Sequence, residues 1–96
     1  MRRLKLMADY GCHPLWGTEA DEIGEVDPAS LPITRALVAD LRRWAEAFDA
    51  TLDPDDPLRS GFATAAARAA FRHEGARLAE RLAAELGEGV RVDYVA

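Results

Sequence analysis

A short segment near the middle of the chain constrains the fold most, because helical patterns flank it and it cannot itself be helical. Residues 52–57 read LDPDDP. Proline lacks the backbone N–H that a helix needs and its ring clashes with the preceding turn, while aspartate favours turns. We therefore expect a break here between two helices, each of which must find a surface on which to bury its apolar side.

The first predicted helix covers residues 35–49, and Thr34 is its expected N-cap. Its large apolar side chains recur at spacings of four, three and four residues, which places them on one face. They are Leu37, Leu41, Trp44 and Phe48. We expect this face to be buried.

The second predicted helix starts near Thr64 and reaches Leu86. Its apolar face carries Phe71, Leu78, Leu82 and Leu86. Gly75 lies on the same face, where glycine costs about 1 kcal/mol relative to alanine. We therefore expect a bulky side chain, Trp44, to approach this glycine closely. Gly87 is the expected left-handed residue after the last turn.

Strand patterns occupy both ends of the chain. Residues 2–10 and residues 90–95 alternate between apolar and polar side chains, which is typical of half-buried strands. Leu15 and Trp16 are predicted to pair with residues 23–26 in a short hairpin. Two consecutive helices reverse the chain twice, so we expect the last strand to run opposite to the first if the two are neighbours.

A length of 96 residues allows one core and not two. The patterns predict a single α+β domain over residues 1–96, in the order β-(loop or short hairpin)-α-α-β, with two antiparallel helices packed on a small sheet. No apolar run approaches the roughly 20 residues that span a bilayer, and the N-terminus lacks a signal-peptide pattern. We therefore expect a cytoplasmic protein that does not bind membranes.

The densest group of reactive side chains lies in residues 9–16. Cys12 beside His13 suggests an activated thiolate, but adjacent residues seldom have the geometry for it, and no metal-ligand spacing is present. We expect no catalytic residue, no metal and no cofactor. The alternative is an enzyme or enzyme accessory that uses this loop, with Cys12 as thiol and Asp55 or Asp56 as carboxylate.

Acidic residues dominate the loops, whereas basic residues gather on the second predicted helix. The net charge of −5 argues against a nucleic-acid binder. The helix carries Arg68, Arg72, Arg77 and Arg81, with Arg77 expected to pair with Glu74 or Glu80 and Arg81 with Glu85. The acidic loops have no such local partners, so they are either solvated or steer a basic protein partner.

Five motifs spread over nearly the whole chain: MADYxCxPLW, DPxxLP, LxxW, DDPxxSGF and FxxEGxxLA. With them the sequence resembles a family of small bacterial proteins, common in high-GC genomes, to which no activity is assigned. The resemblance implies an architecture and a set of motif positions, but no chemistry. Those positions are Cys12, Pro14, Trp16, Trp44, Asp55, Asp56, Pro57, Gly61, Phe62 and Gly75.

A small acidic chain without a catalytic constellation is typical of a protein-binding module. We predict an immunity or inhibitor protein that neutralises a toxin, whose basic cleft would meet the acidic loops. The predicted partner-binding residues are Tyr10, Trp16, Glu19, Asp21, Glu22, Asp55 and Asp56. A structural homo-oligomer, such as a homodimer that extends a sheet between two chains, is the other alternative.

Overall fold

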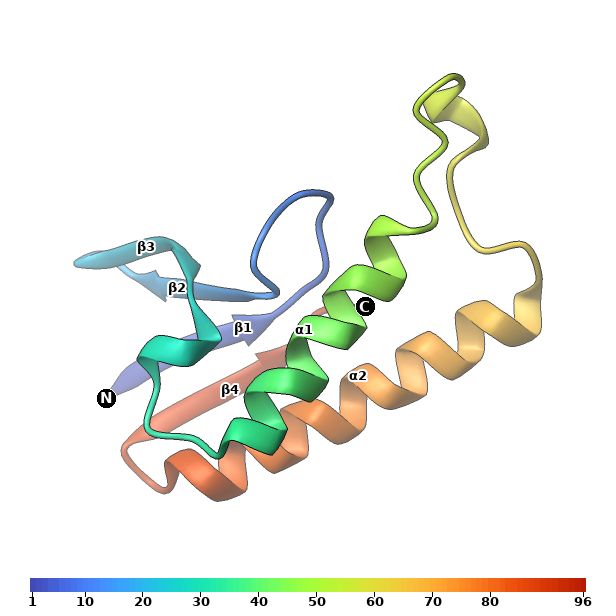
Figure 1. The fold of residues 1–96 in the computed structure, drawn as a ribbon. Coiled ribbons are helices and arrows are strands. Elements are labelled where there is room, and N and C mark those ends of the chain that lie inside the picture. Colours follow the sequence, from blue (N-terminus) through green and yellow to red (C-terminus); the bar gives the residue numbers. More distant parts are fainter.

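Two layers make up the molecule: a four-stranded sheet and a pair of helices on one of its faces (Figure 1). The computed structural model describes residues 1–96. The strands are β1 Arg2–Leu6, β2 Leu15–Glu19, β3 Glu22–Val26 and β4 Val90–Tyr94, in the sheet order β3-β2-β1-β4. The helices are α1 Arg35–Asp49 and α2 Ala65–Leu86, with short 3-10 turns at Pro28–Ser30 and Pro57–Arg59. The predicted α+β architecture is confirmed. Neither α1 nor α2 combines the length and the apolar composition that crossing a membrane requires.

The predicted hairpin is present and is longer than expected. β2 pairs with β3 along its whole length, from Leu15 opposite Val26 to Glu19 opposite Glu22. Gly17 permits this pairing, because a Cβ atom there would collide with the backbone carbonyl oxygen of Glu22. The hairpin therefore adds two strands to the sheet and makes it large enough to cover the helices.

The last strand runs parallel to the first, so the predicted antiparallel arrangement is wrong. The backbone N–H of Arg2 donates to the carbonyl of Gly89 at 3.1 Å, which places the starts of β1 and β4 at the same end of the sheet. Residues 27–34 follow β3 and lead the chain back to that end before α1 begins (Figure 1). This return reverses the chain direction once more than the two helices do. The extra reversal makes β4 parallel to β1.

Both helices begin where the sequence predicts, and each has a threonine as its N-cap. The hydroxyl of Thr34 accepts a hydrogen bond from the N–H of Leu37 at 3.2 Å. Thr64 accepts one from Ala67 at 3.0 Å. Gly87 follows α2 with a φ of 78°, in the left-handed region that glycine adopts without a steric cost.

The core lies between the sheet and the two helices. Ten buried hydrophobic residues form one cluster. They are Leu4, Leu6, Leu15, Val26, Leu31, Leu37, Leu41, Trp44, Leu78 and Leu82. The predicted apolar faces of both helices thus supply the core, and removal of this surface from water is the main term that stabilises the fold.

The large side chain nearest to Gly75 is Tyr94, and not Trp44 as predicted. The hydroxyl of Tyr94 is 2.6 Å from the point that a Cβ atom on this glycine would occupy. Tyr94 reaches α2 because it shares the helix-facing side of the sheet with its strand neighbour Leu6. Trp44 packs nearer the start of α2, where its ring stacks on that of Phe71 with the centroids 4.5 Å apart.

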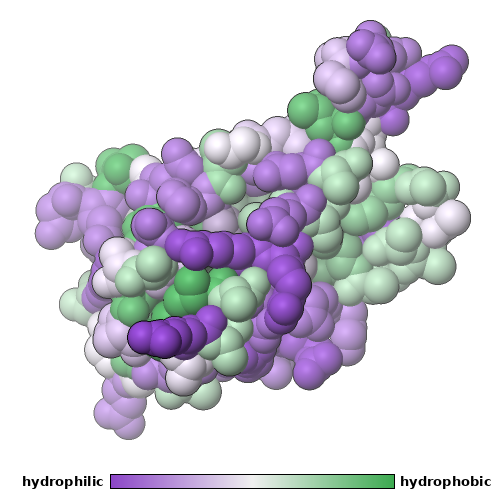
Figure 2. Space-filling view, in the orientation of Figure 1, coloured by the Kyte–Doolittle hydropathy of each residue, from purple (hydrophilic) through white to green (hydrophobic).

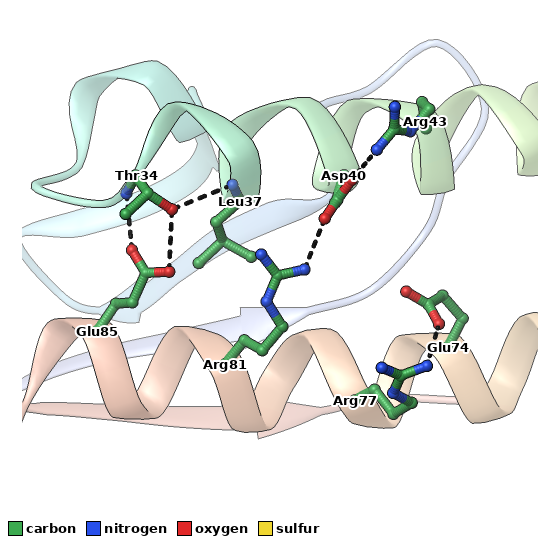
Figure 3. Close-up of polar contacts among 8 residues, drawn as sticks. All are labelled: Thr34, Leu37, Asp40, Arg43, Glu74, Arg77, Arg81 and Glu85. Atoms are coloured by element: carbon green, nitrogen blue, oxygen red, sulfur yellow. Dashed lines mark hydrogen bonds and ion pairs between the residues drawn. The ribbon is translucent and has the colours of Figure 1, made fainter.

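Polar contacts connect α1 and α2 (Figure 3). Nη1 of Arg81 binds Oδ2 of Asp40 at 2.6 Å, and Arg43 binds the other oxygen of the same carboxylate. Glu85 accepts hydrogen bonds from the backbone N–H and the hydroxyl of Thr34, at 2.7 and 3.0 Å. The predicted pair of Arg81 with Glu85 is therefore wrong, since each of the two binds the other helix or its cap.

The molecule opens out at the end where β1 and β4 finish. The chain between the two helices projects beyond the sheet there (Figure 1). Residues 63–70, which include the first turns of α2, are exposed throughout. Helix α2 is therefore covered by the core over its second half and stands free over its first turns.

Candidate partner-binding site

The predicted partner-binding residues fall in three separate places. Glu19, Asp21 and Glu22 lie at the turn between β2 and β3, Trp16 lies on the sheet face away from the helices, and Tyr10, Asp55 and Asp56 lie at the open end. The hairpin turn and the loop with Asp55 and Asp56 are at opposite ends of a molecule 41 Å long (Figure 1). The structure therefore does not bring them together into one site.

The carboxylates of the hairpin have basic partners on β1. Both oxygens of Glu22 accept hydrogen bonds from Arg2, each at 2.8 Å. These bonds lower the pKa of the Glu22 carboxyl. Glu19 lies 4.0 Å from Arg3. Glu19 and Glu22 lack local partners, as expected, but they find basic partners on another strand of the sheet. Asp21, in the turn itself, is exposed and forms no ion pair.

Trp16 is half-buried on the open face of the sheet. Its indole N–H donates to the carbonyl of Met7 at 2.9 Å. The ammonium group of Lys5 lies 5.8 Å from the ring centroid, within the range of a cation–π contact. These contacts give Trp16 a structural role in β1–β2 pairing, and its part in partner binding stays a prediction.

Three carboxylates hold the loop between β1 and β2. Each accepts a hydrogen bond from a backbone N–H of the loop. The pairs are Asp9 with Tyr10 at 2.8 Å, Asp49 with Gly11 at 3.1 Å, and Glu25 with His13 at 2.6 Å. Because backbone donors carry no net charge, these bonds satisfy the carboxylates without neutralising them. Neither Asp9 nor Asp49, which form the resulting acidic surface, was among the predicted partner-binding residues.

The same carboxylates act on Cys12. Partial burial raises the pKa of its thiol, and the negative charges of Glu25, Asp9 and Asp49 raise it further. A raised pKa keeps the thiol protonated and weakens it as a nucleophile. The carboxylates near Cys12 are thus not the ones proposed for the enzyme alternative. No group of three or more potential ligands is placed to hold a metal ion.

A projecting loop joins the two helices, and we call residues 52–60 the arm. Its ends meet at its base, where the N–H of Gly61 donates to the carbonyl of Thr51 at 2.9 Å. Inside the arm, Oδ1 of Asp53 accepts from the N–H groups of Asp55 and Asp56 at 3.0 and 3.1 Å, and the N–H of Asp53 donates to Oγ of Ser60 at 2.9 Å. Together with two prolines, these bonds give the arm a defined shape without support from the core.

The tip of the arm presents an apolar side chain among charged ones. Leu58 is 98% exposed. Asp55 is exposed without an ion pair, and Asp56 binds Arg59 at 3.2 Å. Figure 2 shows that the outer part of the arm is hydrophilic on the face in view, with hydrophobic residues at its base. Sequence reasoning missed Leu58. The signal was available, because this leucine follows two turn-forming prolines and belongs to no helix or strand pattern that would bury it.

An aromatic groove of about 600 Å³ lies between the base of the arm, α1, α2 and the last residues of the chain. Its aromatic lining consists of Tyr10, Trp44, Phe48, Phe62, Phe71 and Tyr94. Arg68 and Arg72 line it from α2. Tyr10 was a predicted partner-binding residue and Phe62 a motif position, but the groove combines segments from five parts of the chain and had no sequence signal of its own.

Comparison with known proteins assigns a function class to this architecture. No curated protein matches the sequence. A family model described as Serratia CdiI immunity protein-like matches residues 2–96. This match supports the predicted immunity protein that neutralises a toxin, and it supplies an activity that the sequence resemblance did not. The chain belongs to the Serratia CdiI immunity protein-like family.

Proposed function

We propose that this protein is an intracellular immunity protein that binds its toxin through the arm and the acidic surface beside it. Family membership supports the immunity activity. One observation supports the arm as the contact: a fully exposed leucine, Leu58, at the tip of a self-bonded loop, next to the carboxylates of Asp55 and Asp56. In this proposal the arm enters a cleft of the toxin and blocks it.

The shape of the arm favours tight binding. A loop that is ordered before association loses less conformational entropy on binding than a flexible one. Asp53 provides that order, since its carboxylate holds the backbone of the next turn. Leu58 then adds an apolar anchor that loses its contact with water only when a partner covers it.

The charge of the arm favours a basic partner. Asp55 has no compensating cation, and Asp49 and Asp9 extend the acidic surface toward the β1–β2 loop. Uncompensated charge of one sign accelerates association with a surface of the opposite sign and discriminates against other partners. A basic cleft, of the kind that binds an anionic substrate, is therefore the surface that we propose the arm covers.

The test searches the genes beside the one for this protein for a toxic domain and uses that domain as the partner. We expect the Asp55→Lys/Asp56→Lys double variant to weaken toxin binding about ten-fold or more in calorimetry, and to lose protection of cells that express the toxin. Leu58→Ala should weaken binding by about ten-fold. Circular dichroism should show an unchanged fold, because all three side chains are outside the core.

Asp21→Lys is the control, because Asp21 is an exposed aspartate without an ion pair and lies in the hairpin turn at the opposite end of the molecule. It should bind and protect like the parent protein. If Asp21→Lys loses protection while the arm variants retain it, the toxin binds the hairpin and the proposal for the arm is wrong. If the parent protein itself does not protect cells against this toxin, the proposed immunity activity is wrong.

A further inference from the structure

Two arginines at the start of α2 have no carboxylate partner, in contrast to the other two on this helix. Arg77 pairs with Glu74 at 3.5 Å, as predicted, and Arg81 pairs with Asp40 (Figure 3). Arg68 and Arg72 form no ion pair and no side-chain hydrogen bond, and both line the aromatic groove. The groove therefore has a positively charged wall inside a molecule of net charge −5.

The floor of the groove is built from packed aromatic rings. Trp44 and Phe71 stack with an interplanar angle of 5°, and Phe62 lies 4.9 Å from Phe71 between centroids. Tyr10 stacks on Phe48 at 4.5 Å, and its hydroxyl bonds to that of a threonine on the arm's base at 2.8 Å. Rings fixed in this way form a rigid apolar surface, and a volume of about 600 Å³ is sufficient for one or two large side chains.

Arg72 faces the groove beside Tyr94. Burial raises the pKa of the Tyr94 hydroxyl, and the positive charge of Arg72 opposes this shift. Both side chains line the groove, and no carboxylate of the protein binds the guanidinium group of Arg72. A carboxylate that entered the groove would find in Arg72 and Arg68 two donors for charge-assisted hydrogen bonds.

We propose that the aromatic groove receives a segment of the toxin in which a large apolar side chain is adjacent to a carboxylate. The apolar side chain would lie on the half-buried rings of Phe62 and Phe71, and the carboxylate would bind Arg68 and Arg72. This inference rests on the proposed function, since it takes the toxin as the partner. Continuity supports it, because Ser60, the last residue of the arm, also lines the groove.

The arm and the groove then recognise opposite charges on neighbouring parts of one partner. Asp55 and Asp56 would contact basic residues of the toxin, while Arg68 and Arg72 would bind an acidic one. Tryptophan, tyrosine and arginine are the residues that most often carry binding energy at interfaces, and the groove supplies all three types. Alternating charge of this kind discriminates between partners more sharply than a single acidic patch does.

The first experiment examines the groove without the toxin, using two short peptides. They are acetyl-Gly-Phe-Asp-Gly-amide and its counterpart with lysine in place of aspartate. We expect the acidic peptide to shift the NMR signals of the Trp44 indole N–H and the Arg72 side chain, and the basic peptide to bind about ten-fold more weakly. Equal binding of both peptides, or no shift with either at millimolar concentration, would overturn the proposal.

Variants locate the binding. Arg72→Glu should no longer bind the acidic peptide and should bind the basic one instead. Arg72→Lys should keep most of the preference for the acidic peptide. Arg35→Glu is the matched control, because Arg35 is an exposed arginine without an ion pair that lies outside the groove. It should bind both peptides like the parent protein. If Arg35→Glu also lost the preference for the acidic peptide, that preference would depend on net charge and the groove proposal would be wrong.

The second experiment measures affinity for the toxin domain itself. We expect Arg72→Glu to weaken toxin binding about ten-fold relative to Arg35→Glu. If the arm variants lose the toxin while Arg72→Glu keeps it, the groove proposal is wrong and the proposed function stands. If Arg72→Glu loses the toxin while the arm variants keep it, the arm is wrong and the groove is the contact.

Discussion

The two ends of the molecule both carry acidic loops, but their carboxylates are satisfied in different ways. At the hairpin end, Glu22 and Glu19 bind the guanidinium groups of Arg2 and Arg3, so charge meets opposite charge. At the arm end, Asp49 and Asp53 bind backbone N–H groups, which satisfy the oxygens and leave the negative charge in place. In the sequence, both ends are simply acidic loops, and nothing distinguishes them. At the hairpin end Asp21 alone lacks a basic partner, whereas Asp49, Asp53 and Asp55 all lack one at the arm end. Most of the uncompensated negative charge that can attract a partner therefore lies at the arm end.

The largest effect is expected for Gly75→Leu, because the new side chain would meet the ring of Tyr94. Overpacking of this kind destabilises a protein by about 1–3 kcal/mol, measured here by urea unfolding. The Tyr94 end of β4 should shift, while NMR signals of Arg2 and Glu22 at the hairpin end stay in place. Gly89→Ala is the control, since nothing lies within 4 Å of a Cβ atom there. Equal stability of Gly75→Leu and the parent would contradict the packing described.

Asp53→Ala tests whether the arm is ordered by its own hydrogen bonds. The substitution removes the acceptor for the N–H groups of Asp55 and Asp56. We expect a loss of about 1 kcal/mol in the local free energy of opening, seen as faster amide hydrogen exchange within the arm. Global unfolding should hardly change, because the arm lies outside the core. Unchanged exchange in the arm would show that the two prolines alone hold its shape.

Cys12 reports on the uncompensated charge at the arm end. Since burial and three carboxylates raise the pKa of its thiol, iodoacetamide should modify it more slowly at pH 8 than it modifies free cysteine. Glu25→Gln removes one of those charges and should speed the reaction a few-fold. Glu46→Gln, at an exposed position that does not act on the thiol, should leave the rate unchanged. Modification faster than that of free cysteine would contradict the raised pKa.

The smallest effect concerns the compensated pair at the hairpin end. Hydrogen bonds from Arg2 lower the pKa of Glu22 in the folded protein below its ordinary value of 4.5. The stability that the pair contributes is therefore fully present above about pH 4.5 and is lost as the pH falls through the lowered pKa. Melting temperatures at pH 7 and pH 3 should differ slightly more for the parent than for Glu22→Gln. Because both side chains are partly exposed, the difference should also shrink in high salt.

Much of the fold could be predicted from local patterns. The spacing from Leu37 to Phe48 and the cap at Thr34 defined α1, and the alternation after Gly87 defined β4, because these signals depend on residues close in sequence. The direction of β4 could not be predicted in this way. It depends on the path of residues 27–34, which contain two prolines and have no periodicity.

The site was less accessible to sequence reasoning. Asp55 and Asp56 were predicted to lie in a turn because aspartate and proline favour one, and their part in partner binding stays a prediction. The partners of Glu19 and Glu22 were missed, since they lie on another strand and no local spacing connects them. The groove was missed for the same reason: Tyr10, Phe48 and Phe71 meet only after both layers of the fold have formed.

The free-standing first turns of α2 explain why this stretch is so rich in alanine. From residue 65 to residue 70 five of the six residues are alanine, and all six are exposed. With no core to hold them, these turns depend on intrinsic helix propensity, in which alanine ranks first. Arg68 and Arg72 thus lie on or next to turns that alanine favours as helix without contacts to the core. The backbone that presents them is in place before any toxin arrives.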